Sequence, residues 1–473
     1  MLPYMASLHG GFVYDDHILV EAAGSTPSAW EDFLHGGLWR DLPAAGYYRP
    51  VLTLSFALDR FLGGGRPFVF HLTNLVLHLL LVLTGWRLLE RYPPTRRLAL
   101  AASVLFAVHP LHVEAVAWIS GRGDLLAPLL GLLAWHAYLK GGWSGGRLAP
   151  PSRLWLMAAG LLFLLALLSK ESAVALPGLV LLPLLAVWPG REKGKSPSQI
   201  WPAGVMVLVL VLALTLRLAA LSGFRGAYGV DPLENPAAGL ALPDRLATSA
   251  GAFITGLRLL IWPAHLTFDY GPPVLGPLHL ATTDGVLSVA GFLGVVLLTV
   301  LVLLLGSRGR PTFLPLGYGL GWMLMAWLPV SSLGPLPGTL LGERFLLFPS
   351  WGWTVMVAAL LAGLSRLFPQ GGRGSVWGAA ISRLFLIGLL LCFATLSSLR
   401  VPDWRSDQAL LNAALAASPV SHRVHFFQGL RLYRRGRMAD ARQAFAACLA
   451  AAPTFSRAHE ALARTFLRLG DRA

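Results

Sequence analysis

The sequence predicts an all-α fold: a polytopic bundle of transmembrane helices followed by a short α-solenoid. The first observation is composition, because 55% of the 473 residues are hydrophobic and only 13% are charged, at a mean hydropathy of +0.62. These values exceed what the core of a soluble protein requires. The second is that long apolar segments recur up to residue 400, and the third is that the chain then becomes rich in Ala and Arg with helical periodicity.

The apolar segments are expected to be spanning helices, because about 20 apolar residues are needed to cross the hydrocarbon core of a bilayer. They are residues 68–90, 98–118, 124–139, 154–168, 173–189, 201–222, 285–306, 312–331, 345–367 and 377–399. A further apolar stretch, residues 246–262, contains Arg258 and ends at Pro263. We expect that stretch to be re-entrant or interfacial rather than a lone span.

Basic residues gather in alternate links between these segments, and the positive-inside rule places such links in the cytoplasm. The cytoplasmic cations are Arg91, Arg96, Arg97, Lys140, Arg147, Arg153, Arg191, Lys193, Lys195, Arg308, Arg310, Arg366, Arg373 and Arg383. The other links then lie outside. The chain is therefore divided into an outside loop, 1–67, a membrane domain, 68–400, and a periplasmic repeat domain, 401–473.

An outside first loop normally follows a helix that exports it. Residues 1–10 contain neither a span nor a signal peptide. We therefore expect that the natural chain begins earlier with one more helix, or that its start is misassigned; unaided translocation of the short loop is the alternative.

The formal charge of +15 comes mostly from Arg in the short links, which describes membrane topology and not a groove for nucleic acid. Cys392 lies in an apolar segment and Cys448 in the helical tail, so neither a disulfide framework nor a cysteine metal site is expected. Abundant Ala, Leu, Gly and Arg with little Lys is typical of a bacterial protein. The expected location is the bacterial inner membrane.

A 34-residue period can be laid over the tail, since Pro419 and Pro453 have this spacing, as do Gly436 and Gly470. Small and aromatic residues occupy the packing positions between them: Gly429, Ala441, Phe445 and Cys448. This pattern is similar to tetratricopeptide repeats, whose helix pairs stack on their neighbours. One repeat is complete, and residues 407–419 and 456–473 are read as helices of the units before and after it. The array then ends with an unpaired helix, so we expect either that the chain is truncated there or that a protein partner covers it.

Two adjacent carboxylates, Asp15 and Asp16, stand in the first outside loop within GGFVYDDHILV. A carboxylate is ionised at neutral pH and can accept the proton of an attacking hydroxyl. The pair is therefore a candidate catalytic site. The structural alternative is a turn or a helix N-cap at the junction of a loop and a helix.

Polar residues also appear near the outer ends of the first two spans. His71, Asn74 and His78 have spacings of three and four and share one helical face, where hydrogen bonds to neighbouring helices are the alternative to a role in the site. The next outer corner contains His109, His112, Glu114, Arg122 and Asp124, with a helix break expected at Pro110.

Ionisable groups at membrane depth are costly and usually functional, so we expect this corner to form a polar wall that orients the acidic pair or a sugar. His109, His112 and Glu114 could alternatively bind a divalent metal, but the pattern is weaker than that of established zinc sites, and no metal is predicted. Arg122 and Asp124 could simply pair with each other and cap the next helix.

Three cations face outside beside apolar or aromatic neighbours: Arg49 in YYRP, Lys170 in SKES and Arg344 in GERFLLFPS. If they converge near the interface, they suit an anionic lipid phosphate. The alternative for Lys170 is an ion pair with Glu171 at a helix end. Glu171 and Glu343 are counted with the polar wall.

The strings FVYDD, YYRPV, FHLTNLVLH, FAVHPLHVEAVAWISGRGDLLA, LLSKES, LTFDYGPP and LGERFLLFPSWGW occur in this order before the repeat-like helices. Together they resemble the transmembrane and tetratricopeptide-repeat O-mannosyltransferase family over nearly the whole chain. The resemblance implies the C-type membrane glycosyltransferase fold. It also implies a polyprenyl-phosphate-linked sugar donor, typically mannose, and a Ser or Thr hydroxyl acceptor on the outer side.

Carried onto this chain, the resemblance implies that Asp15 and Asp16 are the catalytic acid pair. We favour Asp15 as the base and Asp16 as its positioning or acceptor-binding neighbour; the reverse order is the alternative. Arg49, Lys170 and Arg344 would stabilise the leaving phosphate, and Glu114, Arg122 and Asp124 would help to bind the donor. Attack at the anomeric carbon would invert the configuration at that carbon. The alternatives are a non-catalytic membrane scaffold that recruits partners through its repeats, and the same chemistry on a lipid or cell-wall glycan.

Overall fold

The structure is a computed structural model that describes residues 1–21, 47–144, 147–148, 152–187, 201–221, 230–272, 274–368 and 372–470. Within these ranges the chain is helical, apart from one short antiparallel pair of strands, β1 (Trp143–Ser144) and β2 (Arg147–Leu148). The all-α prediction is confirmed. The predicted cytoplasmic link with Arg191, Lys193 and Lys195 lies outside the described residues.

A helix or a broken helix lies at every segment predicted to span the membrane. The helices are α3 (Pro67–Arg91), α4 (Ala99–Val108) with α5 (Val113–Ala117), α6 (Gly123–Gly142), α7 (Arg153–Ser169), α8 (Leu176–Val187), α9 (Trp201–Leu221), α11 (Thr283–Ser307), α12 (Leu314–Trp327), α13 (Leu347–Leu364) and α14 (Gly372–Arg400). Two more helices, α2 (Pro50–Gly63) and α10 (Leu242–Ile261), occupy regions where no full span was predicted.

Among the described residues, five helices are long and apolar enough to cross a membrane, or six when the bent pair α4 and α5 is counted as one span. Three further apolar helices, in α7, at the start of α8 and in α9, are shorter. Helix α10 is continuous over the stretch predicted to be re-entrant or interfacial, and it is not among the candidate spans. These features describe a multi-pass membrane protein.

The predicted helix break at Pro110 is confirmed. Helix α4 ends at Val108, a single turn η5 (Pro110–His112) follows, and the chain turns by 55° into α5. Proline lacks the backbone N–H that would continue the ladder, and its ring clashes with the preceding turn. The break brings the chain after α5 back toward the N-terminal segment.

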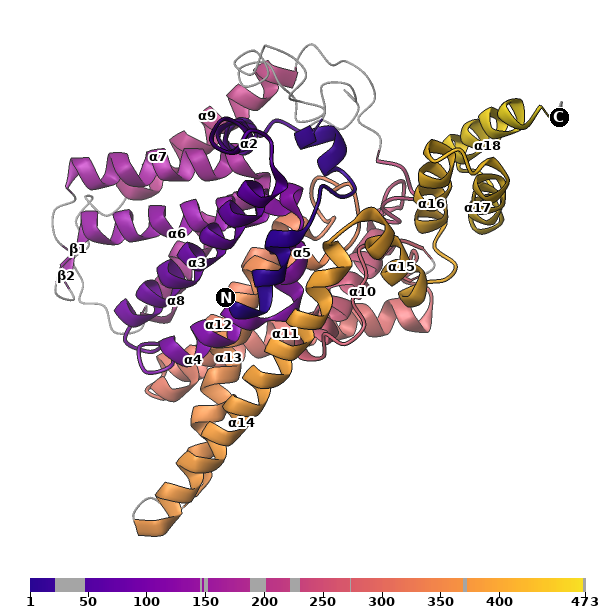
Figure 1. The fold of residues 1–473 in the computed structure, drawn as a ribbon. Helices are drawn as coiled ribbons and strands as arrows, with labels where there is room; N and C mark the ends of the chain where they lie inside the picture. Colours follow the sequence, from indigo (N-terminus) through magenta and orange to yellow (C-terminus); the bar gives the residue numbers. More distant parts are fainter. Residues whose placement is uncertain are drawn as a thin grey trace.

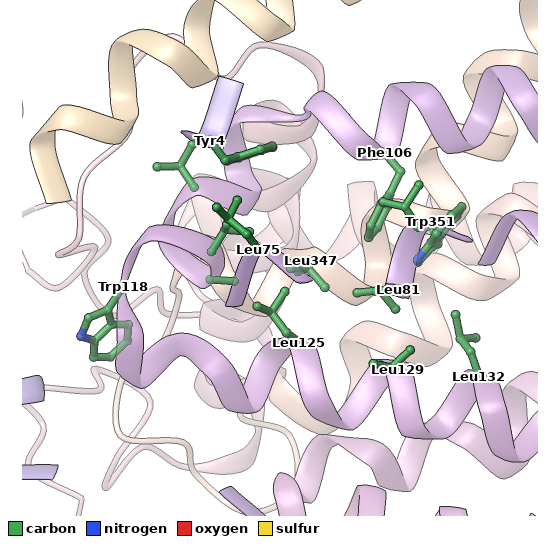
Figure 2. Close-up of a cluster of buried hydrophobic side chains, with 14 of the residues drawn as sticks. Tyr4, Leu75, Leu81, Phe106, Trp118, Leu125, Leu129, Leu132, Leu347 and Trp351 are labelled. Atoms are coloured by element: carbon green, nitrogen blue, oxygen red, sulfur yellow. The ribbon is translucent and has the colours of Figure 1, made fainter. Parts of the chain in front are cut away.

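The largest apolar cluster joins the first spans to α13 (Figure 2). Phe106 stacks on Trp351 with ring centroids 4.0 Å apart, and Gly85 faces the same indole, where a side-chain Cβ would overlap the ring. The N-terminal turn η1 (Leu2–His9) joins this core through Tyr4, whose hydroxyl donates to the carbonyl of His109 at 2.8 Å. The segment that leads to the acidic pair is therefore held against the bundle.

Helices α12 and α13 approach closely at a pair of glycines. A Cβ on Gly319 would lie 2.5 Å from the carbonyl oxygen of Gly352, and a Cβ on Gly352 would overlap the carbonyl oxygen of Gly319. Lipid tails are as apolar as the helix surfaces, so van der Waals contact at small residues contributes much of the association between membrane helices.

The tail forms four helices beside the bundle, α15 (Asp407–Ala417), α16 (His422–Arg434), α17 (Met438–Ala451) and α18 (Ser456–Leu469) (Figure 1). The ring of Phe445 occupies the space left by Gly429. The 34-residue spacing recurs in detail: the imidazoles of His425 and His459 each bond the carbonyl six residues earlier, of Pro419 and Pro453, at 2.8 Å. The spacing is confirmed, and assignment to the tetratricopeptide class stays a prediction.

The glycine contact between α12 and α13 can be tested by Gly352→Ala. The added methyl group has no space, so we expect a loss of about 1–3 kcal/mol in the free energy of unfolding, as for other overpacked sites. Thermal unfolding in detergent measures this. Gly363→Ala in the same helix is the matched control, because a Cβ there meets nothing within 4 Å; equal unfolding temperatures for the two variants would contradict the packing account.

Candidate active site

The acidic pair lies where the N-terminal segment meets the turn after α5 and the start of the C-terminal helices, as the hydrogen bonds of this loop to Ser120, Arg405 and Asp407 show. The chain leaves η1 at Gly10, and the backbone of Gly11 donates to the carbonyl of Arg405 at 3.0 Å. Tyr14 then takes a left-handed conformation, with φ of 56°, just before Asp15 and Asp16. The two neighbouring carboxylates have very different surroundings.

Asp16 is fully buried and anchors the loop. One carboxylate oxygen accepts from the backbone N–H of Ser120 at 2.8 Å and from its hydroxyl at 2.5 Å. The other accepts from the backbone N–H of Val13 at 3.1 Å. Burial raises the pKa of Asp16 to about 6, although these hydrogen bonds oppose the shift.

Asp15 is only partly buried, and within the described part of the chain its carboxylate has no hydrogen-bond partner. Its backbone carbonyl accepts from Ile18 and Leu19 and starts the next turn. Burial raises the pKa of Asp15 to about 7, and the charge of Asp16 acts in the same direction. The cations Arg344 and Arg423 oppose that rise. A carboxyl that is free of partners and titrates near neutrality is suited to accept a proton.

Beside Asp15 lies an ion pair formed by two motifs far apart in the sequence. The backbone N–H of Arg344, in the turn η12 (Glu343–Leu346), donates to Glu114 at 2.8 Å, and its guanidinium bonds the other oxygen of the same carboxylate. The guanidinium also lies over the ring faces of Trp118, at 5.1 Å, and Phe345, at 4.8 Å. Such contacts hold a cation in an apolar setting.

Lys170 lies over the same Phe345 ring, at 5.1 Å from its centroid, and its ammonium bonds both oxygens of Asp124 at 2.5 and 2.6 Å. The pKa of Lys170 is lowered to about 8, mainly by burial; the charge of Asp124 opposes this shift, and the charges of Arg49 and Arg344 act in the same direction as burial. Arg49 in turn pairs with Glu171 at 2.8 Å. The three cations expected to converge are thus close enough to influence one another.

Two of the expected pairings differ in the structure. Lys170 pairs with Asp124, so the alternative in which it pairs with Glu171 is wrong. Glu171 instead forms ion pairs with Arg49 and with Arg217 of α9, the latter at 2.5 Å. Every cation of the group therefore has a carboxylate partner, and an incoming anion would compete with these carboxylates.

Arg122 has a different role from the one expected. It is fully buried and paired at 2.5 Å with Asp59 of α2, so the alternative in which it pairs with Asp124 is wrong. Its other donors are taken by the side chain of Asn74, by Ser55 and by the carbonyl of Phe70. We therefore leave Arg122 out of the donor site, because its guanidinium already joins α2, α3 and the turn after α5.

The polar residues of the predicted wall are buried in the bundle. Asn74 donates to the carbonyl of Trp118 at 3.1 Å, His109 bonds the carbonyl of Leu260 at 3.1 Å, and His112 bonds the hydroxyl of Ser350 at 2.8 Å. These contacts connect helices, as the structural alternative states. His71 is buried, and neither of its ring nitrogens has a hydrogen-bond partner in the part of the chain that the structure describes; Gly10 packs against that ring.

Glu343 is also fully buried and pairs with Arg400 at 3.1 Å, near the hydroxyl of Tyr270, which donates at 3.3 Å. This network ties the GERF motif to the FDYGPP motif and to the end of α14. No group of three or more His, Cys, Asp and Glu side chains that could hold a metal is present in the described ranges.

Some functional partners were missed from the sequence. Ser120 lies within the motif FAVHPLHVEAVAWISGRGDLLA and donates hydrogen bonds to Asp16, and Asp59 neutralises Arg122. Arg423 of α16 reaches Tyr14 from the tail. Only the position of Ser120 within a conspicuous motif indicated a possible role for it. The pairs Arg122–Asp59 and Arg423–Tyr14 join residues far apart in the chain, and residue spacing does not predict such contacts.

The structural role of Arg122 leads to a test. Arg122→Ala should lower the free energy of unfolding by about 3–5 kcal/mol, because the buried carboxylate of Asp59 loses its counter-charge. The double variant Arg122→Met with Asp59→Leu should recover much of this loss, since no charge is then left unpaired. Unfolding in detergent measures both. A single variant that stays fully stable but binds donor weakly would instead restore Arg122 to the donor site.

No family model matches the chain. Among curated proteins, the protein O-mannosyl-transferase TMTC1 of Homo sapiens is 28% identical over 474 residues, which cover 93% of this chain and 53% of that protein. The protein O-mannosyl-transferase TMTC4 of Mus musculus is 27% identical over 484 residues, or 92% of this chain and 63% of that protein.

The protein O-mannosyl-transferase Tmtc2 of Drosophila melanogaster is 33% identical over 282 residues, covering 58% of this chain and 29% of that protein. A solved structure, that of ArnT from Cupriavidus metallidurans bound to undecaprenyl phosphate, is similar with a TM-score of 0.40 at 13% identity, covering 88% of this chain and 75% of that chain. The chain spans a little over half of the length of TMTC1 and less than two thirds of TMTC4. The resemblance predicted from the sequence motifs is confirmed: over about nine tenths of its length, this chain is similar to the protein O-mannosyl-transferases.

Proposed function

We propose that this chain is an inverting glycosyltransferase of the C-type membrane fold. It transfers a sugar, mannose in the first instance, from a polyprenyl-phosphate donor to a Ser or Thr hydroxyl of a protein. The observation that carries the proposal is the contrast between the two adjacent carboxylates. Both oxygens of Asp16 accept hydrogen bonds from the protein. Asp15 has no hydrogen-bond partner among the described residues and lies near Arg344. The names of the similar proteins support the sugar and the acceptor class.

In the proposed step, the hydroxyl oxygen of the acceptor attacks the anomeric carbon of the donor, and Asp15 takes the hydroxyl proton. A bond forms between that oxygen and the anomeric carbon while the bond from the carbon to the phosphate oxygen breaks. The electron pair leaves with the polyprenyl phosphate. The configuration at the carbon inverts because the nucleophile and the leaving group are on opposite faces.

The leaving phosphate gains negative charge, which Lys170, Arg344 and Arg49 are proposed to stabilise. Their present carboxylate partners, Asp124, Glu114 and Glu171, neutralise the buried Lys170 and the partly buried Arg344 and Arg49. A donor phosphate would share or replace these partners. The proposed site is the outer face of the bacterial inner membrane, with the tail on the same side, as the distribution of basic links supports.

The decisive experiment measures transfer of radiolabelled mannose from polyprenyl phosphate mannose to a Ser/Thr-rich peptide by the purified full-length chain. Asp15→Asn should lower kcat by about 100-fold or more, because proton transfer to a positioned base contributes on that scale. Its fold should be retained, since the carboxylate has no hydrogen-bond partner to lose within the described ranges. Asp16→Ala should lower both activity and stability, because it leaves the donors of Ser120 and Val13 unpaired.

Two outcomes would redirect the proposal. If Asp15→Asn transfers sugar as fast as the wild type, Asp15 is not the base. If the folded wild type consumes no lipid-linked sugar with any peptide or glycan acceptor, the scaffold function is favoured. Transfer to glycan but not to peptide keeps the chemistry and changes the acceptor.

The pH dependence of kcat/KM provides an independent check. A base must be deprotonated to act, so activity should be constant above the pKa of Asp15, about 7, and should fall about tenfold per unit as the pH drops below it. A steeper fall is expected near the pKa of Asp16, about 6, where the loop loses its anchor. A flat profile between pH 5 and 8 in a protein that remains folded would exclude Asp15 as the base.

A further inference from the structure

The loop that carries Asp15 is bonded to the C-terminal helices at several points. The backbone N–H of Tyr14 donates to a carboxylate oxygen of Asp407, the first residue of α15, at 2.9 Å. The hydroxyl of the same tyrosine accepts from the guanidinium of Arg423, in α16, at 2.9 Å. Upstream, Gly11 donates to the carbonyl of Arg405. Residues about 390 positions apart in the chain thus meet directly beside the candidate base.

Tyr14 is held in an unfavourable backbone conformation. Its φ of 56° is uncommon for a residue other than glycine, and it persists only where the surroundings enforce it. Besides the two bonds from the tail, its ring packs against Trp118, Phe268 and Phe427, with centroids 5.9, 5.5 and 4.9 Å away. Because Tyr14 directly precedes Asp15, its dihedral angles set the direction in which the chain presents that carboxylate.

Arg423 is itself fixed. Its guanidinium lies 3.6 Å from the carboxylate of Asp269, whose other oxygen accepts from the hydroxyl of Ser421 at 2.5 Å. Ser421 also caps α16 by accepting from the backbone of Val424 at 3.2 Å. The motif LTFDYGPP therefore helps to position a cation of the tail at the site.

The charged groups that face Asp15 come from four parts of the chain. They are Asp16 of the same loop, Arg344 of η12, Arg423 of α16 and Glu234 of the segment before α10. Two of these groups are cations, and one of the cations belongs to the tail. On the loop's other side, His17 bonds the second oxygen of Asp407 at 3.0 Å.

We propose that Asp407 and Arg423 are positioning residues of the transfer reaction, so that the catalytic site is complete only when α15 and α16 are docked on the loop of Asp15. This inference rests on the proposed function. Asp407 acts by holding the backbone of Tyr14 through its carboxylate oxygen. Arg423 acts by holding the hydroxyl of Tyr14 and by placing a positive charge near Asp15.

The test compares kcat, the KM for the acceptor peptide and the pH profile in full-length variants. Asp407→Ala should lower kcat by up to about 100-fold, the scale of a 1 Å misplacement of a catalytic group. Asp407→Asn should recover most of this loss, because its amide oxygen can still accept from Tyr14. Arg423→Gln should shift the acid limb of kcat/KM to higher pH, because the base loses a neighbouring cation, whereas Arg423→Lys should keep the limb near that of the wild type.

Arg434→Gln is the matched control, because Arg434 lies in the same helix α16 but is exposed. Hydrogen exchange of residues 10–20 provides a readout that does not depend on activity: it should become faster in Asp407→Ala and remain slow in Asp407→Asn and in the control. Thermal unfolding in detergent checks that each variant is folded.

The outcomes separate this inference from the function on which it rests. If the wild type transfers sugar and both Asp407→Ala and Arg423→Gln match its kcat and its pH profile, the inference is overturned and the proposed function stands. Equal loss of activity in Asp407→Ala and Asp407→Asn would also overturn it, since the retained hydrogen bond would then be irrelevant. A folded wild type that transfers no sugar would overturn the proposed function and this inference together.

Discussion

The arrangement of the site depends on one buried carboxylate. Asp16 accepts hydrogen bonds from Ser120 and from Val13, and it thereby joins the N-terminal loop to the turn η6 (Ile119–Arg122) after the bent span. A buried carboxylate without such donors would be costly. Among the described residues, the adjacent carboxylate of Asp15 has no hydrogen-bond partner, and it is close enough to Arg344 and Arg423 to be influenced by their charges.

A second constraint is the cost of burying charge. Arg122 with Asp59, Lys170 with Asp124, Arg344 with Glu114 and Arg400 with Glu343 are all pairs with little or no solvent exposure. In a low-dielectric interior each such cation needs a partner. The pairs differ in how firmly they are held: Arg122 is enclosed by further acceptors, whereas Lys170 and Arg344 share the ring of Phe345 near Asp15. This difference separates a structural ion pair from those proposed to receive a phosphate.

The tail is also part of this arrangement. The loop of Asp15 packs on α15 and α16 through Tyr14, so the repeat-like helices and the membrane bundle meet at the candidate catalytic residue. A repeat domain that only recruited partners would have no reason to supply a partly buried arginine at this point. The contact gives a physical route by which the position of the tail could set the position of the base.

The sequence alone determined the all-helical membrane architecture, the places of the helices, the break at Pro110 and the 34-residue spacing of the tail, because these follow from local apolar periodicity and from proline and glycine chemistry. It also identified the Asp15 and Asp16 motif and the resemblance to a mannosyltransferase family. Only the tertiary structure decided which carboxylate is anchored and which has no hydrogen-bond partner among the described residues. It also decided that Arg122 pairs with Asp59 and Lys170 with Asp124, and that Asp407 and Arg423 meet the loop of Asp15. Such pairings join residues tens to hundreds of positions apart in the chain. They form because an unpaired buried charge is costly wherever the fold places it. Residue spacing does not indicate which charges the fold will bury together.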